Sequence, residues 1–271
     1  MQFVDKAFAR RLESVEEMPQ VFYARAFQKS RPEIGAAEEK ICGGHMIFAG
    51  LGSPIGRATA AGLDQEFKAE DADRIEQFYR AHQAPSQVDL CPLHDPPVFE
   101  MFKERGYAIA ELNNVLFRPL DPAEEFPTQP AGCEIRPSPI EEAEVTGKIV
   151  EDAFFPDGAP EAFRGLIIPL YQMEHARAFV AAVNGKPVSC ATGLVIPEHK
   201  VFAMCGAGTL VDYRGRGFQT ALFYARMKAA LAAGCEFAVV VTQGGSTSQR
   251  NAERLGFRVA YSKVTVIKQL E

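Results

Sequence analysis

Apolar positions recur with helical spacing after residue 217 and then give way to a continuous apolar run. Four apolar residues follow one another at spacings of four, three and four, the stripe of a helix packed on a sheet: Phe218, Leu222, Ala225 and Ala229. Gly234 is a typical helix end, and residues 237–242 are rich in β-branched side chains. The pattern predicts a long helix followed by a strand with both faces buried.

Upstream of this helix the chain shows the pattern of an antiparallel sheet. Strands are predicted over 133–136, 178–183, 188–196 and 200–210, and helices over 140–155 and 161–171. Asn184-Gly185 separates two of the strands and is a strong signal for a two-residue hairpin turn. These elements predict an α/β fold of the α+β type, with a mixed, mostly antiparallel sheet flanked by helices.

A proline-rich stretch separates this half of the chain from the preceding half. Pro119, Pro122, Pro127 and Pro130 interrupt a segment that has no periodic apolar pattern. Proline removes backbone donors and stiffens the chain, which is typical of a linker. Since 271 residues are enough for two domains, we expect one domain at 1–120, a linker at 121–131 and a second domain at 132–271.

The N-terminal half repeats the pattern of the C-terminal half. The helical segment 98–105, followed by Gly106-Tyr107, precedes 248–255 and its Gly256-Phe257 by a constant offset of 150 residues. Such an echo indicates duplication, and a coincidence of two α/β patterns is the alternative.

The loop between the last antiparallel strand and the long helix is suited to an anion. A loop that leads into a helix N-terminus offers unpaired backbone N–H groups and the positive end of the helix dipole. Gly215 and Gly217 allow a sharp turn and close approach to the backbone, while Arg214 and Arg216 add permanent positive charge. No comparable loop precedes the N-terminal helix expected at 70–82, so a first copy would lack this site.

Two common phosphate-binding motifs do not fit this loop. A Walker loop needs Lys directly after its second glycine, and no Lys follows either glycine here. A dinucleotide fingerprint needs a third glycine at position 220, which is Thr220.

The segment resembles the acyl-CoA-binding motif of the GNAT superfamily of N-acetyltransferases, which reads Arg or Gln, two residues, Gly, one residue, then Gly or Ala. Arg214 and Gly217 match it, Leu210-Val211 matches the strand end before it, and Gln219 departs from it. Residues 246–257, which contain Leu-Gly-Phe, resemble the last helix and turn of the family. The resemblance extends from about Cys133 to the end of the chain and implies a GNAT-like fold, duplicated if the N-terminal echo is real.

The resemblance implies acetyl-CoA as cofactor, with its pyrophosphate on the amides of 216–220 and oxyanion donors at the strand end. The expected cofactor-binding residues are Leu210, Val211, Arg214, Gly215, Arg216, Gly217, Phe218, Gln219, Thr220, Ser248 and Asn251. For Ser248 and Asn251, helix capping and surface solvation are the alternatives. The acceptor pocket is expected to use Phe154, Phe155 and Tyr171, which could equally be core residues.

The proton donor does not follow from the motif. The family's tyrosine would fall at Ala252, and Tyr261 is the nearest substitute, with an ordinary strand aromatic as the alternative. No carboxylate occurs from 201 to 211 to act as a base. Cys205 is more typical of a small buried hydrophobe than of a nucleophile.

Composition narrows the class of ligand and the setting. A net charge of −6 argues against a general nucleic-acid binder, yet basic residues flank the loop and would steer a polyanion to it: Arg214, Arg216, Arg226, Lys228, Arg250, Arg254 and Arg258. The six cysteines lack metal-binding spacing, so we expect reduced thiols and no metal. The N-terminus does not resemble a signal segment, and no apolar run approaches the ~20 residues that cross a bilayer.

We therefore expect a cytoplasmic N-acetyltransferase, monomeric or homodimeric, without nucleic-acid or membrane partners. It would move an acetyl group directly from acetyl-CoA to the amine of a small molecule or peptide. One alternative is a non-catalytic CoA-binding sensor or scaffold of the same fold. Another is an interaction protein that acts through its N-terminal unit.

Overall fold

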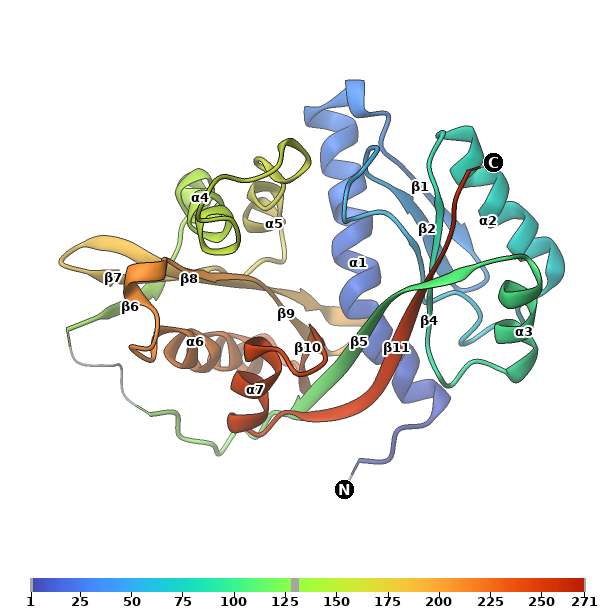
Figure 1. The fold of residues 1–271 in the computed structure, drawn as a ribbon. Helices are drawn as coiled ribbons and strands as arrows, with labels where there is room; N and C mark the ends of the chain where they lie inside the picture. The colour runs from blue at the N-terminus through green and yellow to red at the C-terminus, as the bar shows by residue number, and fades with distance from the viewer. Residues whose placement is uncertain (1, 128–131, 271) are drawn as a thin grey trace. The chain divides into compact units, whose positions relative to one another are not determined.

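The computed structural model describes residues 2–127 and 132–270, and contacts divide the chain into two compact units. Unit 1 comprises Met1–Phe117 and Val241–Glu271, and unit 2 comprises Arg118–Val240 (Figure 1). Residues 128–131 of the expected linker lie outside the described residues, and 121–127 belong to unit 2. The expected C-terminal domain of 132–271 differs from unit 2 because the last strand of the chain pairs within unit 1.

Unit 1 contains a six-stranded sheet with helices on its faces. Its elements are α1 (Lys6–Ser30), a 3₁₀ turn η1 (Pro32–Ile34), β1 (Ala37–Ile41), β2 (Gly44–Phe48), β3 (Ala58–Thr59), α2 (Ala69–Ala81), β4 (Ser86–Leu90), α3 (Pro96–Glu104), β5 (Ala108–Pro119), α7 (Thr247–Arg254) and β11 (Arg258–Lys268). The strand order is β1-β2-β3-β4-β11-β5, with β11 antiparallel to both β4 and β5.

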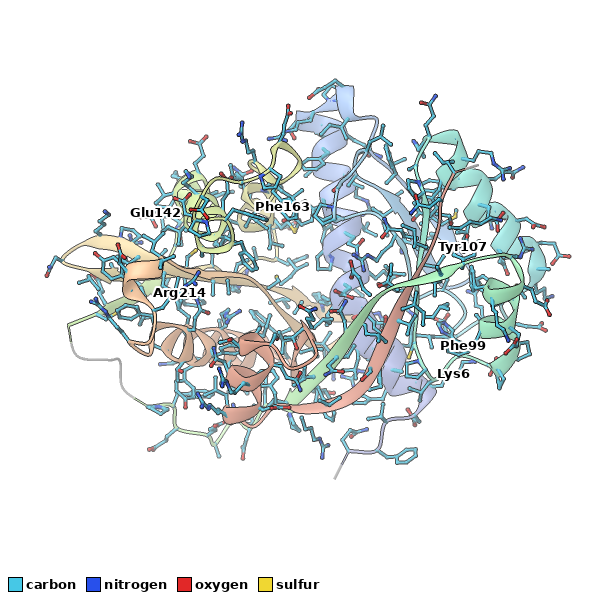
Figure 2. The ribbon with its side chains drawn as sticks, viewed as in Figure 1. Lys6, Phe99, Tyr107, Glu142, Phe163 and Arg214 are labelled. Carbon is cyan, nitrogen blue, oxygen red and sulfur yellow. The ribbon has the colours of Figure 1, made fainter. Side chains whose placement is uncertain are left out.

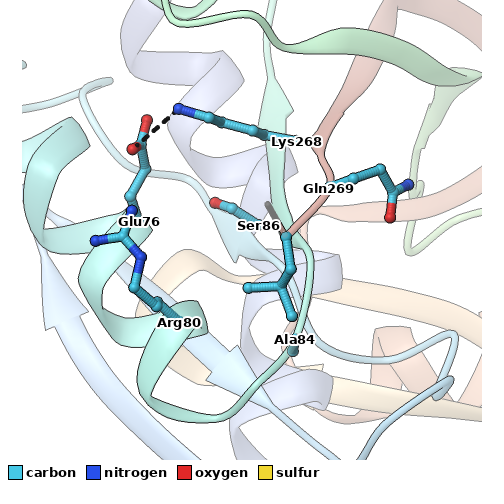
Figure 3. Close-up of a pocket in the computed structure, with 7 residues that line it drawn as sticks. Glu76, Arg80, Ala84, Ser86, Lys268 and Gln269 are labelled. Carbon is cyan, nitrogen blue, oxygen red and sulfur yellow. Dashed lines mark hydrogen bonds and ion pairs between the residues drawn. The ribbon is translucent and has the colours of Figure 1, made fainter.

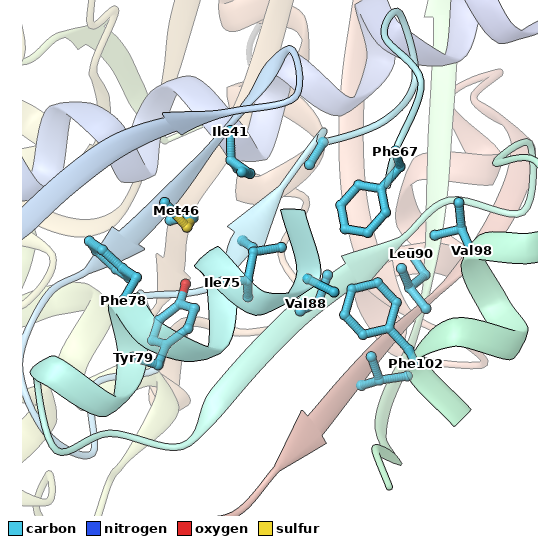
Figure 4. Close-up of a cluster of buried hydrophobic side chains, with 14 of the residues drawn as sticks. Ile41, Met46, Phe67, Ile75, Phe78, Tyr79, Val88, Leu90, Val98 and Phe102 are labelled. Atoms are coloured by element: carbon cyan, nitrogen blue, oxygen red, sulfur yellow. The ribbon is translucent and has the colours of Figure 1, made fainter. Parts of the chain in front are cut away.

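The two faces of the unit 1 sheet carry different helices. On one face, side chains of α2 and α3 pack on β1, β2 and β4 in a cluster that includes Met46, Ile75, Val88 and Phe102 (Figure 4). On the other face, residues of α1 pack against Ile47 of β2. Alternation along β2 thus sends successive side chains into two cores, which explains why the whole strand is buried.

Unit 2 contains a five-stranded sheet that leads into the predicted anion loop. Its elements are β6 (Glu134–Pro137), η2 (Ile140–Glu142), α4 (Ala143–Phe154), η3 (Glu161–Phe163), α5 (Ile168–Gln172), β7 (Phe179–Val183), β8 (Lys186–Ile196), η4 (Pro197–His199), β9 (Val201–Thr209), η5 (Val211–Tyr213), α6 (Phe218–Ala232) and β10 (Phe237–Gln243), in which the boundary between the units falls. The strand order is β6-β7-β8-β9-β10. Only the β9–β10 pair in this order is parallel.

Helices cover both faces of the unit 2 sheet. Helix α4, together with Tyr171 of α5, packs on Val180 and Cys190 of one face. Helix α6 packs through Phe218 and Leu222 on Ala191 and its neighbours on the other face (Figure 1). The sheet is therefore the middle layer of a three-layer unit, as the uninterrupted burial of β8 from Val188 to Ile196 requires.

Most predicted elements of unit 2 are confirmed, with one clear exception. Asn184 and Gly185 both have positive φ, 52° and 76°, as a two-residue hairpin turn requires. The single helix predicted over 161–171 is wrong, because the structure has the turn η3 and the short helix α5 instead. Gly165 lies between them with φ +67°, and Pro169 allows a helix to begin there but not to run through it.

The two units share one internal pattern. In each, the strand before a long helix is parallel to the strand after it: β3 to β4 around α2, and β9 to β10 around α6. The first of these pairs is much shorter, because β3 has only the two residues Ala58–Thr59.

Candidate functional site

The predicted anion loop is exposed and leads directly into α6. Residues 214–217 are all exposed, and Phe218, the first residue of the helix, is buried. Gly215 and Gly217 have φ of +75° and +80°, a conformation that strains any other residue. A Cβ on Gly215 would meet nothing within 4 Å, so the space beside the loop backbone is open.

The backbone amides of this loop lack protein partners. Within 2–127 and 132–270, no acceptor is found for the amides of 215–220, and the first amide to enter the helical ladder is that of Ala221, which donates to Gly217 O at 3.1 Å. Gly217 is the N-cap of α6 and has no side chain that could satisfy these donors. Unpaired amides and the positive end of a 15-residue helix therefore coincide at an exposed position.

The arginine side chains of the loop stabilise its shape. The guanidinium of Arg214 donates to Ala153 O at the end of α4 at 2.5 Å and to Thr209 O at 3.3 Å (Figure 2). That of Arg216 donates to Asp212 O at 2.9 Å and lies over the ring of Tyr213. Both arginines hold the loop while their charge stays beside the free amides.

Gln219, which departs from the family motif, points into the sheet. Its Nε2 donates to Ser189 Oγ at 3.1 Å, Gly208 O at 3.1 Å and Thr209 Oγ1 at 3.0 Å. The side chain therefore joins the start of α6 to the ends of β8 and β9. It does not cover the amides that face the solvent.

Strand β9 has an open edge that ends at the loop. It pairs with β10 only from Val201↔Phe237 to Ala203↔Val239, so its later residues have no partner in that ladder. Its pairing with β8 shifts register between Cys190↔Gly208 and Thr192↔Cys205. The Leu210 amide donates to Val188 O at 3.0 Å, so this expected oxyanion donor is already engaged.

The two glycines of β9 serve local geometry and helix packing. Gly206 has φ +52° at the register shift, and a Cβ there would lie 2.7 Å from Leu170 Cδ2 and 2.8 Å from Thr192 Cγ2. A Cβ on Gly208 would lie 2.9 Å from Val150 Cα. The absence of these side chains is therefore required by α4 and α5, independently of any ligand.

The three expected acceptor residues have different surroundings. Phe154 is 67% exposed at the end of α4. Phe155 packs on Phe163 with 4.8 Å between ring centroids. Tyr171 is buried, and its hydroxyl donates to Gly206 O at 2.5 Å. Only Phe154 presents an open apolar surface, and Tyr171 holds the register shift of β9.

The remaining expected site residues belong to unit 1. Helix α7 is capped by Ser246, whose Oγ accepts from Gln249 N at 3.2 Å, whereas Ser248 is exposed and Asn251 is half-buried. Tyr261 is buried in β11 and its hydroxyl donates to Glu13 Oε1 at 2.7 Å. Burial and the neighbouring Glu13 carboxylate raise the pKa of Tyr261 well above its usual value, so its proton is firmly held.

Tyr261 is part of a buried group of charges that sequence reasoning missed. Lys263 contacts the carboxylates of Glu13, Glu16 and Asp89, and Arg57 donates to Thr265 and Glu111 beside them. These residues lie far apart in the sequence, from position 13 to position 265, and form no motif. Asp89 keeps a lowered pKa because the cations Lys263 and Arg57 outweigh the effect of burial.

A pocket of about 330 Å³ lies elsewhere in unit 1 (Figure 3). Its lining includes Glu76, Arg80, Ser86 and Lys268, and the Glu76–Lys268 ion pair spans 3.2 Å. It contains none of the residues that the sequence analysis proposed for a site.

The sequence analysis was wrong about Arg226. It grouped this residue with the basic residues that would steer a polyanion to the loop, but the side chain is 1% exposed and so does not contribute a surface charge.

Comparison with protein families decides between the motifs considered for the loop. Residues 146–257 match the model of the acetyltransferase (GNAT) family, a segment that includes β9, the anion loop and α6. This part of the chain is a GNAT domain. No curated protein sequence matches the chain.

Solved structures extend the GNAT likeness over most of the chain. A GCN5-related N-acetyltransferase from Kribbella flavida has a TM-score of 0.64 at 20% identity, with 92% of this chain and 96% of that protein covered. A tandem GNAT protein from the clavulanic acid biosynthesis pathway has a TM-score of 0.61 at 14% identity, over 86% of this chain and 78% of that protein. A GCN5-related N-acetyltransferase from Sphaerobacter thermophilus gives 0.55 at 19% identity, over 73% and 65%.

These matches confirm the predicted fold class, a mixed and mostly antiparallel sheet flanked by helices in the GNAT arrangement. The GNAT segment crosses the boundary between the two compact units, because it continues through α7. In the described parts of the chain, no helix combines the length and apolar character needed to cross a membrane.

Proposed function

We propose that this protein is an N-acetyltransferase that moves an acetyl group from acetyl-CoA to the amine of a small molecule or peptide. The observation that carries the proposal is the row of unpartnered amides at 215–220, which begins in an exposed loop at the positive end of α6. Donors in this arrangement fit the pyrophosphate of CoA, because each phosphate oxygen can accept from the backbone without displacing an existing bond.

The open edge of β9 supports the same proposal. Backbone groups of 204–209 have no partner from β10 and could pair with the amide-bearing arm of CoA as an added strand would. Because the Leu210 amide is engaged, Val211 is the remaining expected donor to the oxyanion. When bound, acetyl-CoA would supply the activated acyl group.

Direct transfer to the amine agrees with the low reactivity of the Cys205 thiol in β9. Burial raises the pKa of Cys205 to about 12, although Arg226 acts in the opposite direction. A thiol that stays protonated at neutral pH is a poor nucleophile. The acyl group would therefore pass to the amine without an enzyme-bound intermediate.

We further propose that the N-terminal part of the chain is a degenerate second copy of the GNAT fold. The shared pattern of parallel strands around α2 and α6 supports a duplication. At the start of α2, however, Asp71 accepts from the Lys68 amide at 3.0 Å, and Glu70 adds a second negative charge. An acidic, capped helix end repels phosphate, so only the second copy would bind the cofactor.

Substitution of Gly217 tests the placement of the cofactor. Gly217→Val should abolish acetyl-CoA binding, since a β-branched residue resists φ +80° and would crowd the amides. Gly234→Val is the matched control, because Gly234 has φ +76° at the far end of α6, and a Cβ there would meet nothing within 4 Å. Calorimetric titration of both variants, each checked for folding, should show loss in the first alone. Equal affinity in the two variants would rule out this placement.

Catalysis requires a second measurement. Release of CoA from acetyl-CoA should depend on an added amine in a panel of small amines and peptides. Binding without turnover on any of them would argue against an enzyme and for a CoA-binding sensor.

A further inference from the structure

Arg226 presents a buried positive charge without a counter-ion. It lies on the sheet-facing side of α6, 1% exposed, and in the described residues of the chain no carboxylate pairs with it. Its Nε donates to Leu222 O at 3.2 Å, one of its terminal nitrogens donates to Thr192 O at 3.1 Å, and the other terminal nitrogen has no partner. Buried charges in proteins are normally paired, so this arrangement calls for an explanation.

The Phe223 ring faces the guanidinium, with 4.6 Å between the guanidinium carbon and the ring centroid, and the polar groups that act on the charge are neutral. The Tyr171 hydroxyl and the thiols of Cys190 and Cys205 are the groups whose partial charges act on it. Thr192 is fully buried, and its Oγ1 also has no hydrogen-bond partner. Burial lowers the pKa of Arg226 to about 10, which still leaves the guanidinium charged at neutral pH. The free Arg226 nitrogen is therefore a buried, charged donor without a hydrogen-bond partner.

The thiols do not supply the missing negative charge. Burial raises the pKa of Cys190 and that of Cys205 to about 12, so both are neutral. The Tyr171 phenol is likewise held protonated, because burial raises its pKa well above the usual value. In the described part of unit 2, the groups whose charge acts on Arg226 are thus neutral at pH 7.

The guanidinium lies at the register shift of β9, next to the open edge of that strand. Its acceptor Thr192 pairs with Cys205, the residue before Gly206. Arg226 itself is buried. Cys205, Gly206 and Ala207 are half-buried, so this part of β9 is accessible to solvent. If the cofactor arm follows β9 as proposed above, it passes Cys205, whose strand partner Thr192 accepts the hydrogen bond from Arg226.

We infer that Arg226 recognises a carboxylate carried by a substrate of the transferase, with the free guanidinium nitrogen as its donor. This inference rests on the proposed function. A carboxylate would neutralise the buried cation and satisfy its unpartnered nitrogen, and the guanidinium suits carboxylate geometry. The carboxylate could belong to the far end of a dicarboxylic acyl group or to an amino-acid acceptor.

Two matched pairs of ligands test the inference on the full chain. Succinyl-CoA and butyryl-CoA have acyl chains of equal carbon number, and only the first ends in a carboxylate. An amino acid and its amide, offered with acetyl-CoA, differ in the same way at the acceptor. We expect at least a tenfold preference for the carboxylate form in one pair, in dissociation constant for the thioesters or in kcat/KM for the acceptors. The pair that shows the preference identifies the source of the carboxylate.

Arg226→Met should remove this preference while leaving butyryl-CoA binding within about threefold. The free variant should melt at the same temperature as the wild type or higher, because it removes an unpaired buried charge. Arg226→Lys, which keeps one charge, should retain part of the preference. A purely structural arginine would instead give a lower melting temperature and no ligand discrimination in the wild type.

Equal use of both members in both pairs by the wild-type protein would overturn the inference. That result is distinct from failure of the proposed function. If butyryl-CoA binds without any carboxylate preference, only the role of Arg226 is lost. If no CoA thioester binds, the acetyltransferase proposal itself is wrong.

Discussion

Lys263 and Glu13 form an ion pair in the interior of unit 1, with 3.2 Å between Nζ and Oε2 and 1% of each side chain exposed. The pair joins β11, near the end of the chain, to α1, near its beginning. Glu16 and Asp89 also contact the same ammonium group, and Arg57 places a second positive charge beside Asp89. The pairing fixes the C-terminal strand within the N-terminal unit.

Removal of this cation should strongly destabilise the protein. Lys263→Met would leave the buried carboxylate of Glu13 without its counter-ion, and we expect a loss of about 3–5 kcal/mol in the free energy of unfolding. Lys103→Met is the control, because Lys103 forms an exposed ion pair with Glu100 in the same unit, and its loss should hardly change stability. Denaturant unfolding of both variants measures the difference. Similar small losses in the two would show that the buried pair contributes little.

The same site predicts a pH dependence of stability. Burial, the largest influence, raises the pKa of Glu13 above 4.5, although Lys263 lowers it. The folded state therefore holds the proton more tightly than the unfolded state, and stability from this group declines as pH rises above about 4.5 through the folded pKa. Glu13→Gln cannot titrate, so the difference in unfolding free energy between wild type and variant should shift against the wild type as pH rises. A difference that stays constant from pH 4 to 8 would contradict the raised pKa.

Gln219→Ala separates two roles for the unusual residue of the motif. The structure gives the side chain three hydrogen bonds to β8 and β9, so its loss should cost about 1–2 kcal/mol of stability. Because the side chain points away from the exposed amides, affinity for acetyl-CoA should change less than about threefold. A gain of tenfold or more would mean that Gln219 hinders the cofactor.

The fold and the anion loop of unit 2 follow from local patterns. The hairpin at Asn184-Gly185 and the helix that begins at Phe218 depend on turn chemistry and on the spacing of apolar residues, which neighbouring residues determine. The broken helix at 161–171 was missed because a positive φ at Gly165 is decided by packing. Glycine adopts positive and negative φ about equally readily, so its presence in the sequence does not tell which one the fold selects.

Helix α1 and the buried charges were harder to find in the sequence. Glu13 and Glu17 lie on the buried side of α1, and Pro19 lies inside the helix, so its apolar stripe is interrupted. The partners Asp89 and Lys263 come from distant strands. Arg226 misled for the same reason: a charged residue on a helix is normally exposed, and only tertiary structure shows that this one is buried.

The central claim, that the amides of 215–220 bind the pyrophosphate of CoA, is tested most directly by nuclear magnetic resonance. Backbone amide signals of a deuterated, ¹⁵N-labelled protein would be followed while CoA is added. We predict saturable downfield proton shifts for the amides of this loop, where new charge-assisted hydrogen bonds form, and no comparable shifts at the start of α2. Loop signals that stay unchanged at saturating CoA, or that respond less than those of α2, would contradict the account.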